Sequence, residues 1–299
     1  MPSPPQTYLY GIMIVRLAPT PSGYLHKGNV FNFLLNWLWA RGNGGKVLLR
    51  IDDGDAARKR TEYLEDIFRV LEWLGMDWDI GPASVQDFEQ HWSQQHRLQL
   101  YNEWLNQWAQ QGTIYACTCS RKQMEEVQTC ACREKNMPLN TPGAAWRMPV
   151  PTAETISIYD KALGNINGVL ASFNGSVIVR RKDGIPAYQL CSLADDHHFH
   201  ITHIARGEDL LPSTLVQLYL NRQSTFPFLH QCRFWHHPLV QNKKGEKLSK
   251  SAGAGSESIL NYEHKPQLLT AFAEWLGYAG MNVTRTEELL HLPVFKELY

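Results

Sequence analysis

The segment 17–29, LAPTPSGYLHKGN, ends in a histidine, a lysine, a glycine and an asparagine in succession. A helix that begins near Gly28 and Asn29 points its free N–H groups, and the positive end of its dipole, beyond the edge of a sheet. Gly28 lets a phosphate approach the backbone, while His26 and Asn29 can donate hydrogen bonds to phosphate oxygens. The segment therefore indicates a phosphate-binding turn. An ordinary strand-to-helix turn with a solvent-facing His26 is the alternative.

A second candidate for phosphate chemistry is KLSKS at 247–251, in a loop that contains glycine. Its two lysines, Lys247 and Lys250, are three residues apart, which suits a mobile arm that grasps a pyrophosphate. Alone, such a charge run is typical of a solvated surface. When KLSKS follows a turn like that at 17–29 in the same chain, the combination is a specific signal for phosphate binding.

The sequence around the turn predicts a strand before it, and a helix and a second strand after it. The runs GIMIVRL (11–17) and KVLLRI (46–51) favour strands, and 29–42 has helical spacing of apolar residues. This is a βαβ unit and predicts a parallel sheet. Helices are also predicted over 61–75, 96–112 and 213–223, and strands over 176–181 and 233–240. The segment 201–207 is a regular element of unassigned type. The segment 187–196 is another regular element, in which we place Tyr188 at the start of a strand.

Composition narrows the class of protein. The chain has 299 residues, 43% of them hydrophobic, and 29 basic residues balance 29 acidic ones, so no global positive field indicates a nucleic-acid partner. We find no apolar run long enough to span a bilayer and no signal-peptide pattern at the N-terminus, and we expect a cytoplasmic protein with no membrane partner.

Four of the six cysteines form two C-x-C pairs, Cys117 with Cys119 and Cys130 with Cys132. Two such pairs around a short polar loop can close a tetrahedral site of four sulfurs, which favours Zn²⁺. Because no coordination position stays open, the zinc would be structural. Two disulfides are the alternative, disfavoured in a reducing compartment.

A second cluster, DDHHFHITH, holds His197, His198, His200 and His203. In an extended segment alternate residues face opposite ways, so we do not expect these histidines to converge on a metal. Cys191 is interpreted as a core residue. His236 and His237 are expected to line the nucleotide pocket or the end of a strand.

The motifs RLAPTPSGYLHKGN, RIDDGD, AYQLCSLADDHH, THIARGEDLLPST and KLSKS follow one another in an order that resembles the catalytic core of class I glutamyl-type aminoacyl-tRNA synthetases, over about residues 12–255. The first and last correspond to the two ATP signatures of that class. Full-length members continue with a long helical anticodon-binding region, whereas this sequence has 48 residues after Ser251. It therefore resembles the truncated glutamyl-Q branch, which activates glutamate and attaches it to queuosine in the anticodon loop of tRNA(Asp).

The resemblance implies ATP with Mg²⁺, and in-line attack of a substrate carboxylate on the α-phosphate. The residues that it implies for catalysis are His26, Asn29, Lys247 and Lys250, and Gly28 joins them in ATP binding. In the same branch a zinc site begins with a matching C-x-C. Its third ligand can be a tyrosine there, so the resemblance leaves the role of Cys130 open.

For glutamate, the resemblance implies Arg16 and Arg206 as cations for the side-chain carboxylate, because an arginine fork pairs bidentately with a carboxylate. Either could instead pair with an acid such as Glu208. The rest of the implied pocket is Leu17, Ala18, Pro19, Thr20, Asp52, Tyr188 and Ser192. Asp52 stands where the family usually has Glu, and Ser192 where longer relatives tend to carry Asn, which leaves the choice of amino acid open.

The predicted fold is α/β: a Rossmann-like parallel-sheet catalytic domain, split by a small zinc-braced insertion and followed by a short helical tail. We expect the catalytic domain in 1–112 and 187–255, the insertion that faces the acceptor in 113–186, and the tail in 256–299. The expected partners are L-glutamate and queuosine-containing tRNA(Asp), bound by a monomer. A ligase for another amino acid or a non-tRNA acceptor, and a non-catalytic RNA- or nucleotide-binding paralogue, are the alternatives.

Overall fold

The computed structural model describes residues 11–126, 130–170, 173, 175–240 and 256–296, and the chain divides into two compact units. Unit 1 comprises Met1–Gln94, Ile201–Glu208 and His237–Tyr299, and unit 2 comprises Gln95–His200 and Asp209–His236. Lys247 and Lys250 lie outside the described residues. The four-part division expected from the sequence stays a prediction.

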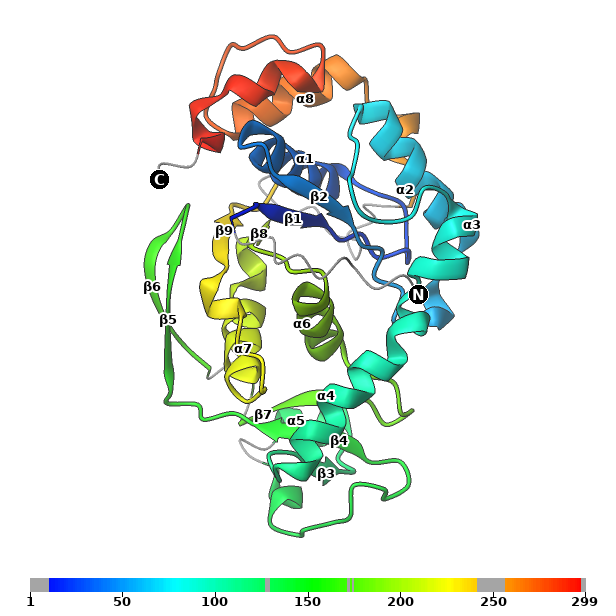
Figure 1. Ribbon diagram of the computed structural model, residues 1–299, viewed down its shortest axis with the longest axis vertical. Helices are drawn as coiled ribbons and strands as arrows, with labels where there is room; N and C mark the ends of the chain where they lie inside the picture. Colours follow the sequence, from blue (N-terminus) through cyan, green and yellow to red (C-terminus); the bar gives the residue numbers. More distant parts are fainter. Residues whose placement is uncertain (1–10, 127–129, 171–172, 174, 241–255, 297–299) are drawn as a thin grey trace. The chain divides into compact units, whose positions relative to one another are not determined.

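Helices and strands alternate along much of the chain (Figure 1). The strands are β1 Ile14–Leu17, β2 Lys46–Leu49, β3 Tyr115–Cys117, β4 Ala145–Pro149, β5 Thr155–Asp160, β6 Gly164–Val169, β7 Ser176–Arg180, β8 His203–Gly207 and β9 Arg233–His237. The helices are α1 Lys27–Gly42, α2 Thr61–Leu74, α3 Val85–Asp87, α4 Leu98–Gln110, α5 Arg121–Glu126, α6 Tyr188–His198, α7 Leu211–Arg222 and α8 Lys265–Trp275. In the part of the chain that the structure describes, no helix combines the length and the hydrophobicity needed to cross a bilayer.

Unit 1 is built on the predicted βαβ unit. Strands β1 and β2 pair in parallel, with Val15 opposite Val47, and α1 connects them. On the other edge of β1, the hydroxyl and the N–H of Thr202 bond the backbone of Ile14, just before β8. Helix α8 lies next to α1 in Figure 1, where Phe31 packs edge-on against Phe272. The parallel α/β core expected from the sequence is confirmed.

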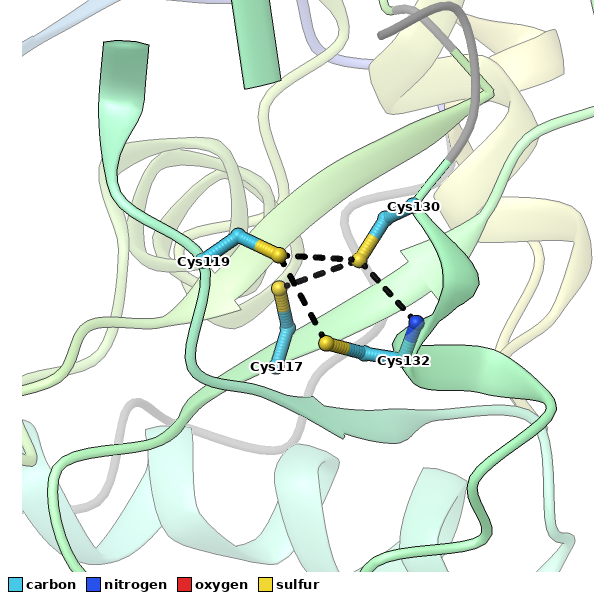
Figure 2. Close-up of side chains that lie close together, drawn as sticks. All are labelled: Cys117, Cys119, Cys130 and Cys132. Atoms are coloured by element: carbon cyan, nitrogen blue, oxygen red, sulfur yellow. Dashed lines mark hydrogen bonds between the residues drawn. The ribbon is translucent and has the colours of Figure 1, made fainter. Parts of the chain in front are cut away.

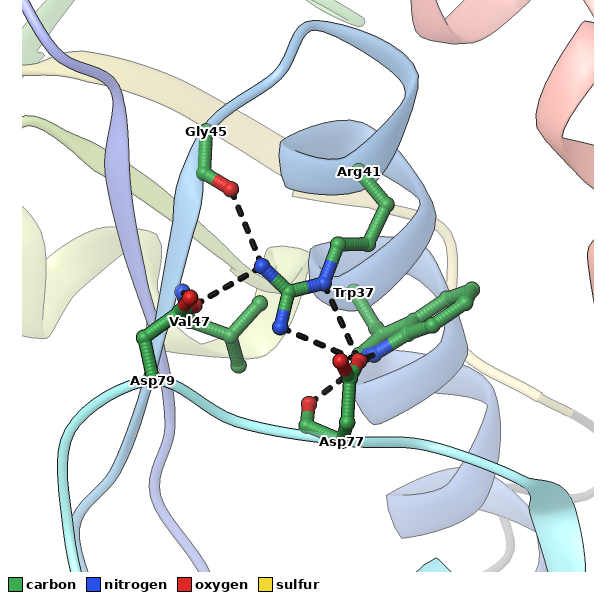
Figure 3. A network of polar contacts seen from close by, with 6 residues as sticks. All are labelled: Trp37, Arg41, Gly45, Val47, Asp77 and Asp79. Atoms are coloured by element: carbon green, nitrogen blue, oxygen red, sulfur yellow. Dashed lines mark hydrogen bonds and ion pairs between the residues drawn. The ribbon is translucent and has the colours of Figure 1, made fainter.

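Helix α1 is buried on most of its faces, as expected of a helix between a sheet and a second helix. Near its C-terminal end the Arg41 guanidinium donates to the Gly45 carbonyl at 3.1 Å and to Asp79 Oδ2 at 2.7 Å (Figure 3). The same Asp79 oxygen accepts the N–H of Val47 at 2.8 Å. Arg41 therefore ties the end of α1 to the start of β2.

Unit 2 holds the antiparallel strands and the cysteine-containing segment. Strands β3, β4 and β7 form one antiparallel sheet, and β5 and β6 form a hairpin. Arg97, the N-cap residue of α4, forms a buried ion pair with α6, in which its fork donates to both oxygens of Asp195 at 2.8 and 3.0 Å. The Tyr101 hydroxyl donates to the same carboxylate at 2.8 Å.

The strand predicted to start at Tyr188 is wrong, because residues 188–198 form α6. A short run of apolar residues fits a buried helix as well as a strand, and tertiary contacts decide between them. Here the pairing of Asp195 with Arg97 and the burial of Leu190 and Leu193 hold the segment as a helix.

The extended conformation assumed for the histidine-rich segment is wrong for the same reason. His197 and His198 belong to the last turn of α6, His200 follows in the left-handed region at φ +55°, and His203 begins β8. The His197 ring packs against Trp104, Phe226 and Phe228. Burial lowers the pKa of both His197 and His198 below the ordinary value, so both are held as neutral rings near pH 7.

Candidate functional site

The segment that follows β1 runs beside the segment that follows β2. The Arg50 N–H donates to the Leu17 carbonyl at 2.9 Å, and the Asp52 N–H donates to the Pro19 carbonyl at 2.8 Å. The backbone of Leu17–Thr20 and the side chain of Asp52, both predicted for the glutamate pocket, are therefore brought together in unit 1.

His26 is the N-cap of α1 and half of a capping box. Its Nδ1 accepts the Gly28 N–H at 3.1 Å, and Asn29 Oδ1 accepts the His26 N–H at 3.2 Å. Because Nδ1 accepts a hydrogen bond, the neutral ring carries its proton on Nε2. The His26 side chain is buried, so the solvent-facing alternative is wrong.

Gly28 is needed for a reason that the sequence does not reveal. A Cβ at this position would lie 3.0 Å from His26 Cε1 and 3.1 Å from His26 Nδ1. An alanine here would require the imidazole to shift by a few tenths of an ångström. Gly28 thus keeps His26 in place, in addition to leaving the backbone open.

A buried acid on α2 anchors the same turn. Asp66 is fully buried, and its Oδ2 accepts the Leu25 N–H at 3.2 Å. No short-range pattern in the sequence connects residues 41 positions apart, so this contact could not be predicted.

The two predicted arginines of the glutamate pocket are both buried in unit 1, Arg16 at 6% exposure and Arg206 at 4%. The Arg16 guanidinium donates to the carbonyl oxygen of Ala205 at 3.5 Å, which sets it beside the segment that carries Arg206. The Asn36 amide of α1 bonds both the N–H and the carbonyl of Ala205, at 3.4 and 3.2 Å. These contacts place Arg16 and α1 against β8, the strand that carries Arg206.

Asp52 is paired with Arg50, a residue that the sequence analysis did not single out. The Arg50 Nε lies 2.7 Å from Asp52 Oδ1, and Nη2 lies 3.1 Å from Oδ2. The signal was available, because residues two apart in an extended segment share a side. The next acid, Asp53, is buried and accepts hydrogen bonds from the Ser93 hydroxyl and the Gln94 N–H.

Tyr188 and Ser192 lie in unit 2, one helical turn apart on α6. Tyr188 is 50% exposed, whereas Ser192 is buried. Cys191, between them, is buried as expected of a core residue.

The paired histidines of β9 have different partners. His236 is buried between Asp160 and Thr214, at 2.7 and 2.6 Å, and His237 Nε2 lies 3.1 Å from Asn32 Oδ1. Burial acts to raise the pKa of Asp160, but hydrogen bonds from His236 and the backbone outweigh it and hold that pKa below its ordinary value.

The four cysteines of the two C-x-C pairs converge, as Figure 2 shows. Cys130 Sγ lies 3.4 Å from the sulfurs of Cys117 and Cys119, and the four sulfurs are all within 4.8 Å of one another. A tetrahedral site with ~2.3 Å metal–sulfur bonds spaces its sulfurs about 3.8 Å apart. The cysteines are free thiols, so the disulfide alternative is wrong, and Cys130 belongs to the cluster.

Three thiols of the cluster differ in the direction of their pKa shift. Burial acts to raise the pKa of the Cys132 thiol, but the Thr118 N–H and the other three thiols outweigh it and lower that pKa to about 7. Burial raises the pKa of Cys130 and of Cys119. The Lys182 ammonium also donates to the Thr118 carbonyl at 2.7 Å, between two of the cysteines. The four-cysteine cluster is consistent with a structural zinc site.

Comparison with known proteins decides the family. Residues 13–297 match the model of the family described as tRNA synthetases class I (E and Q), catalytic domain. The chain belongs to this family. Among curated members, it is 41% identical to a glutamyl-Q tRNA(Asp) synthetase from Pseudomonas fluorescens, over 80% of this chain and 76% of that protein.

The chain is also similar to longer members of the class I synthetase family. It is 33% identical to a glutamate–tRNA ligase from Thermodesulfovibrio yellowstonii, over 92% of this chain and 60% of the ligase, so it spans about 60% of the length of that relative. The crystal structure of a glutamate–tRNA synthetase from Elizabethkingia anophelis superposes with a TM-score of 0.68 at 26% identity, covering 81% of this chain and 53% of that one. The class I synthetase fold with a four-cysteine insertion, expected from the sequence, is confirmed.

Proposed function

We propose that the protein is an ATP-dependent ligase that activates L-glutamate as glutamyl-adenylate and transfers the glutamyl group to queuosine in tRNA(Asp). The observation that carries the activation half is the capped N-terminus of α1, in the unit that also buries Arg16 and Arg206. The acceptor half is supported by the 41% identity to a glutamyl-Q tRNA(Asp) synthetase.

In the first step, a carboxylate oxygen of glutamate forms a bond to the α-phosphorus of ATP. The bond from that phosphorus to the bridging oxygen breaks, and the electron pair leaves with pyrophosphate. The protein acts by positioning the reactants and by stabilising the charge that develops on phosphate oxygens. Lys247 and Lys250 are proposed to hold the departing pyrophosphate, whose charge a Mg²⁺ ion bound with ATP would reduce.

His26 and the first N–H groups of α1 are proposed to serve the α-phosphate. The capping box supports this role, because Nδ1 is engaged with the Gly28 N–H and the ring proton is on Nε2, the donor position. Asn29 is fixed by its bond to the His26 N–H, so its amide group has a defined orientation. Because Gly28 has no side chain, the His26 imidazole can stay in its cap position.

The glutamate pocket is proposed to use Arg16 and Arg206 for the side-chain carboxylate and Asp52 for the ammonium group. Burial strengthens such pairing, because charges interact more strongly away from water. The backbone of Leu17–Thr20 is proposed to flank the substrate, and Tyr188 and Ser192 of α6 are proposed as further glutamate-binding residues.

In the second step, a nucleophilic group of the acceptor base attacks the acyl carbon, loses its proton, and AMP leaves with the electron pair of the broken acyl–phosphate bond. The zinc that Cys117, Cys119, Cys130 and Cys132 are proposed to hold would brace the segment around it. Four sulfurs leave no open coordination position, so this zinc would take no part in either step.

The test is amino-acid-dependent exchange of labelled pyrophosphate into ATP, across twenty amino acids, with and without tRNA. Charging of queuosine-containing and queuosine-free tRNA(Asp) follows. We expect exchange with glutamate and charging of the queuosine form alone. Lys250→Ala should reduce exchange by about 100-fold or more, whereas Lys243→Ala, in the same charged segment, should not.

Each other result favours a different function. Exchange with another amino acid would identify a ligase whose pocket is changed at Asp52 and Ser192. Exchange with glutamate but no charging of either tRNA would point to another acceptor. No exchange with any amino acid would favour a non-catalytic RNA- or nucleotide-binding protein.

A further inference from the structure

Arg50 and Asp52 form an ion pair inside unit 1, where Arg50 is 3% and Asp52 8% exposed. Both bonds run from one guanidinium to one carboxylate, from Nε to Oδ1 at 2.7 Å and from Nη2 to Oδ2 at 3.1 Å. Such a fork fixes the plane and the rotation of the carboxylate, which a single point charge does not.

The pair lies directly beside the segment proposed to flank glutamate. The N–H groups of Arg50 and Asp52 bond the carbonyls of Leu17 and Pro19, so backbone contacts hold both ends of the pair against that segment. The backbone of both residues is therefore anchored to the Leu17–Pro19 segment.

We propose that Arg50 is a positioning residue for the amino acid, which holds the Asp52 carboxylate in the orientation that receives the substrate ammonium group. This inference rests on the proposed function. A carboxylate can accept about four hydrogen bonds, so two from Arg50 are compatible with more from an ammonium group.

The bidentate contact from Arg50 matters for how Asp52 would recognise the substrate ammonium group. The aspartate side chain is short, so the Asp52 carboxylate reaches only a short way from the backbone toward a ligand. Arg50 also offsets much of the carboxylate's charge. Recognition of the ammonium therefore depends on where the oxygens are fixed, rather than on an excess of negative charge.

The decisive variant is Arg50→Lys, which keeps the positive charge but loses the fork. We expect the KM for glutamate in pyrophosphate exchange to rise about tenfold or more, while the KM for ATP changes less than about twofold. Arg41→Lys is the matched control, because Arg41 also bonds acids through a fork but at the far end of α1. It should leave both KM values unchanged.

A double-mutant cycle with Asp52→Asn identifies the partner. If Arg50 acts through Asp52, Arg50→Lys should add little to the KM for glutamate once Asp52→Asn is present. Arg50→Gln, which keeps a neutral donor, is the second variant should Arg50→Lys lower the melting temperature too far for assay. It should give the same selective rise in the KM for glutamate.

Additive effects in the cycle would overturn the inference, as would equal increases in both KM values or a normal KM for glutamate in both Arg50 variants. Failure of the proposed function is distinguishable, because the wild-type protein would then show no exchange with glutamate. That result would overturn the proposed role of Arg50 as well. Normal wild-type exchange with unaltered Arg50 variants would overturn the inference alone.

Discussion

The cysteine cluster at 117–132 and the turn at 17–29 are organised in opposite ways. The cluster takes four identical ligand atoms from two short segments of one unit. Among the described residues, buried Met124 and partly buried Tyr115 and Met137 pack with the four cysteines. The turn is held by contacts from distant parts of its unit, including Asp66 of α2 and the residues after β2.

The two regions therefore differ in what stabilises their folded structure. Few buried side chains surround the cluster among the described residues, so the proposed zinc would supply much of the free energy of folding there. Around the turn, backbone hydrogen bonds, a capping box and buried side chains hold the geometry without a ligand. The cluster should therefore collapse when its ion is removed, and the turn should remain.

The largest expected effect is that of metal removal. The protein should contain about one zinc per chain, and its loss should unfold the cysteine segment, since structural zinc contributes an apparent ~10 kcal/mol or more. Elemental analysis and hydrogen exchange before and after chelation measure this, with protection lost around 115–150 and retained in α1. Cys132→Ser should behave as the chelated protein does, and Cys232→Ser, outside the cluster, as the wild type does. A zinc-free chain with normal protection around 115–150 would contradict the comparison.

The second effect falls on chemistry at the turn. His26→Ala should lower pyrophosphate exchange by about 100-fold, because a donor to the developing charge is lost, and should cost about 1 kcal/mol of stability with the lost cap. His26→Asn separates the two roles, since asparagine is a good N-cap residue but presents a different donor. It should restore the free energy of unfolding and leave exchange low. Full exchange in either variant would remove His26 from the proposed mechanism.

How far the sequence could predict each region follows from the same difference. The C-x-C spacing of the cluster is local, so its four residues could be named before the structure. The contact between Asn36 and Ala205 joins residues 169 positions apart and has no local signature. Helix α6 was mistaken for a strand because its short apolar run suits both, and the contact of Asp195 with Arg97 decided the outcome.

A smaller effect is expected from Asp79→Asn at the other end of α1. Burial acts to raise the pKa of Asp79, but the Val47 N–H and Arg41 outweigh it and hold that pKa below the ordinary 3.8. The contribution of the charge is therefore present above about pH 4 and is lost as the pH falls through the folded-state pKa. Asp79→Asn should cost about 0.5–1 kcal/mol at pH 7, discounted for partial exposure. The difference from the wild type in urea unfolding should shrink at pH 3, and a constant difference would contradict the assignment.

The smallest expected effect is the most specific to the turn. In Gly28→Ala the new Cβ meets His26 Cε1 at 3.0 Å and Nδ1 at 3.1 Å, so the imidazole must shift by a few tenths of an ångström. Stability should change by less than about 1 kcal/mol, because alanine favours the helix while the cap weakens. The KM for ATP should nevertheless rise several-fold, since a shift of the ring displaces the proposed donor. Steady-state exchange with varied ATP measures it, and Gly42→Ala, at the C-terminal end of α1 where a Cβ would meet its nearest atoms at 3.5 Å, controls for the loss of a glycine elsewhere. If Gly28→Ala alters stability but leaves the KM for ATP unchanged, the order of the turn is structural alone, and the contrast with the cluster would then concern folding rather than function.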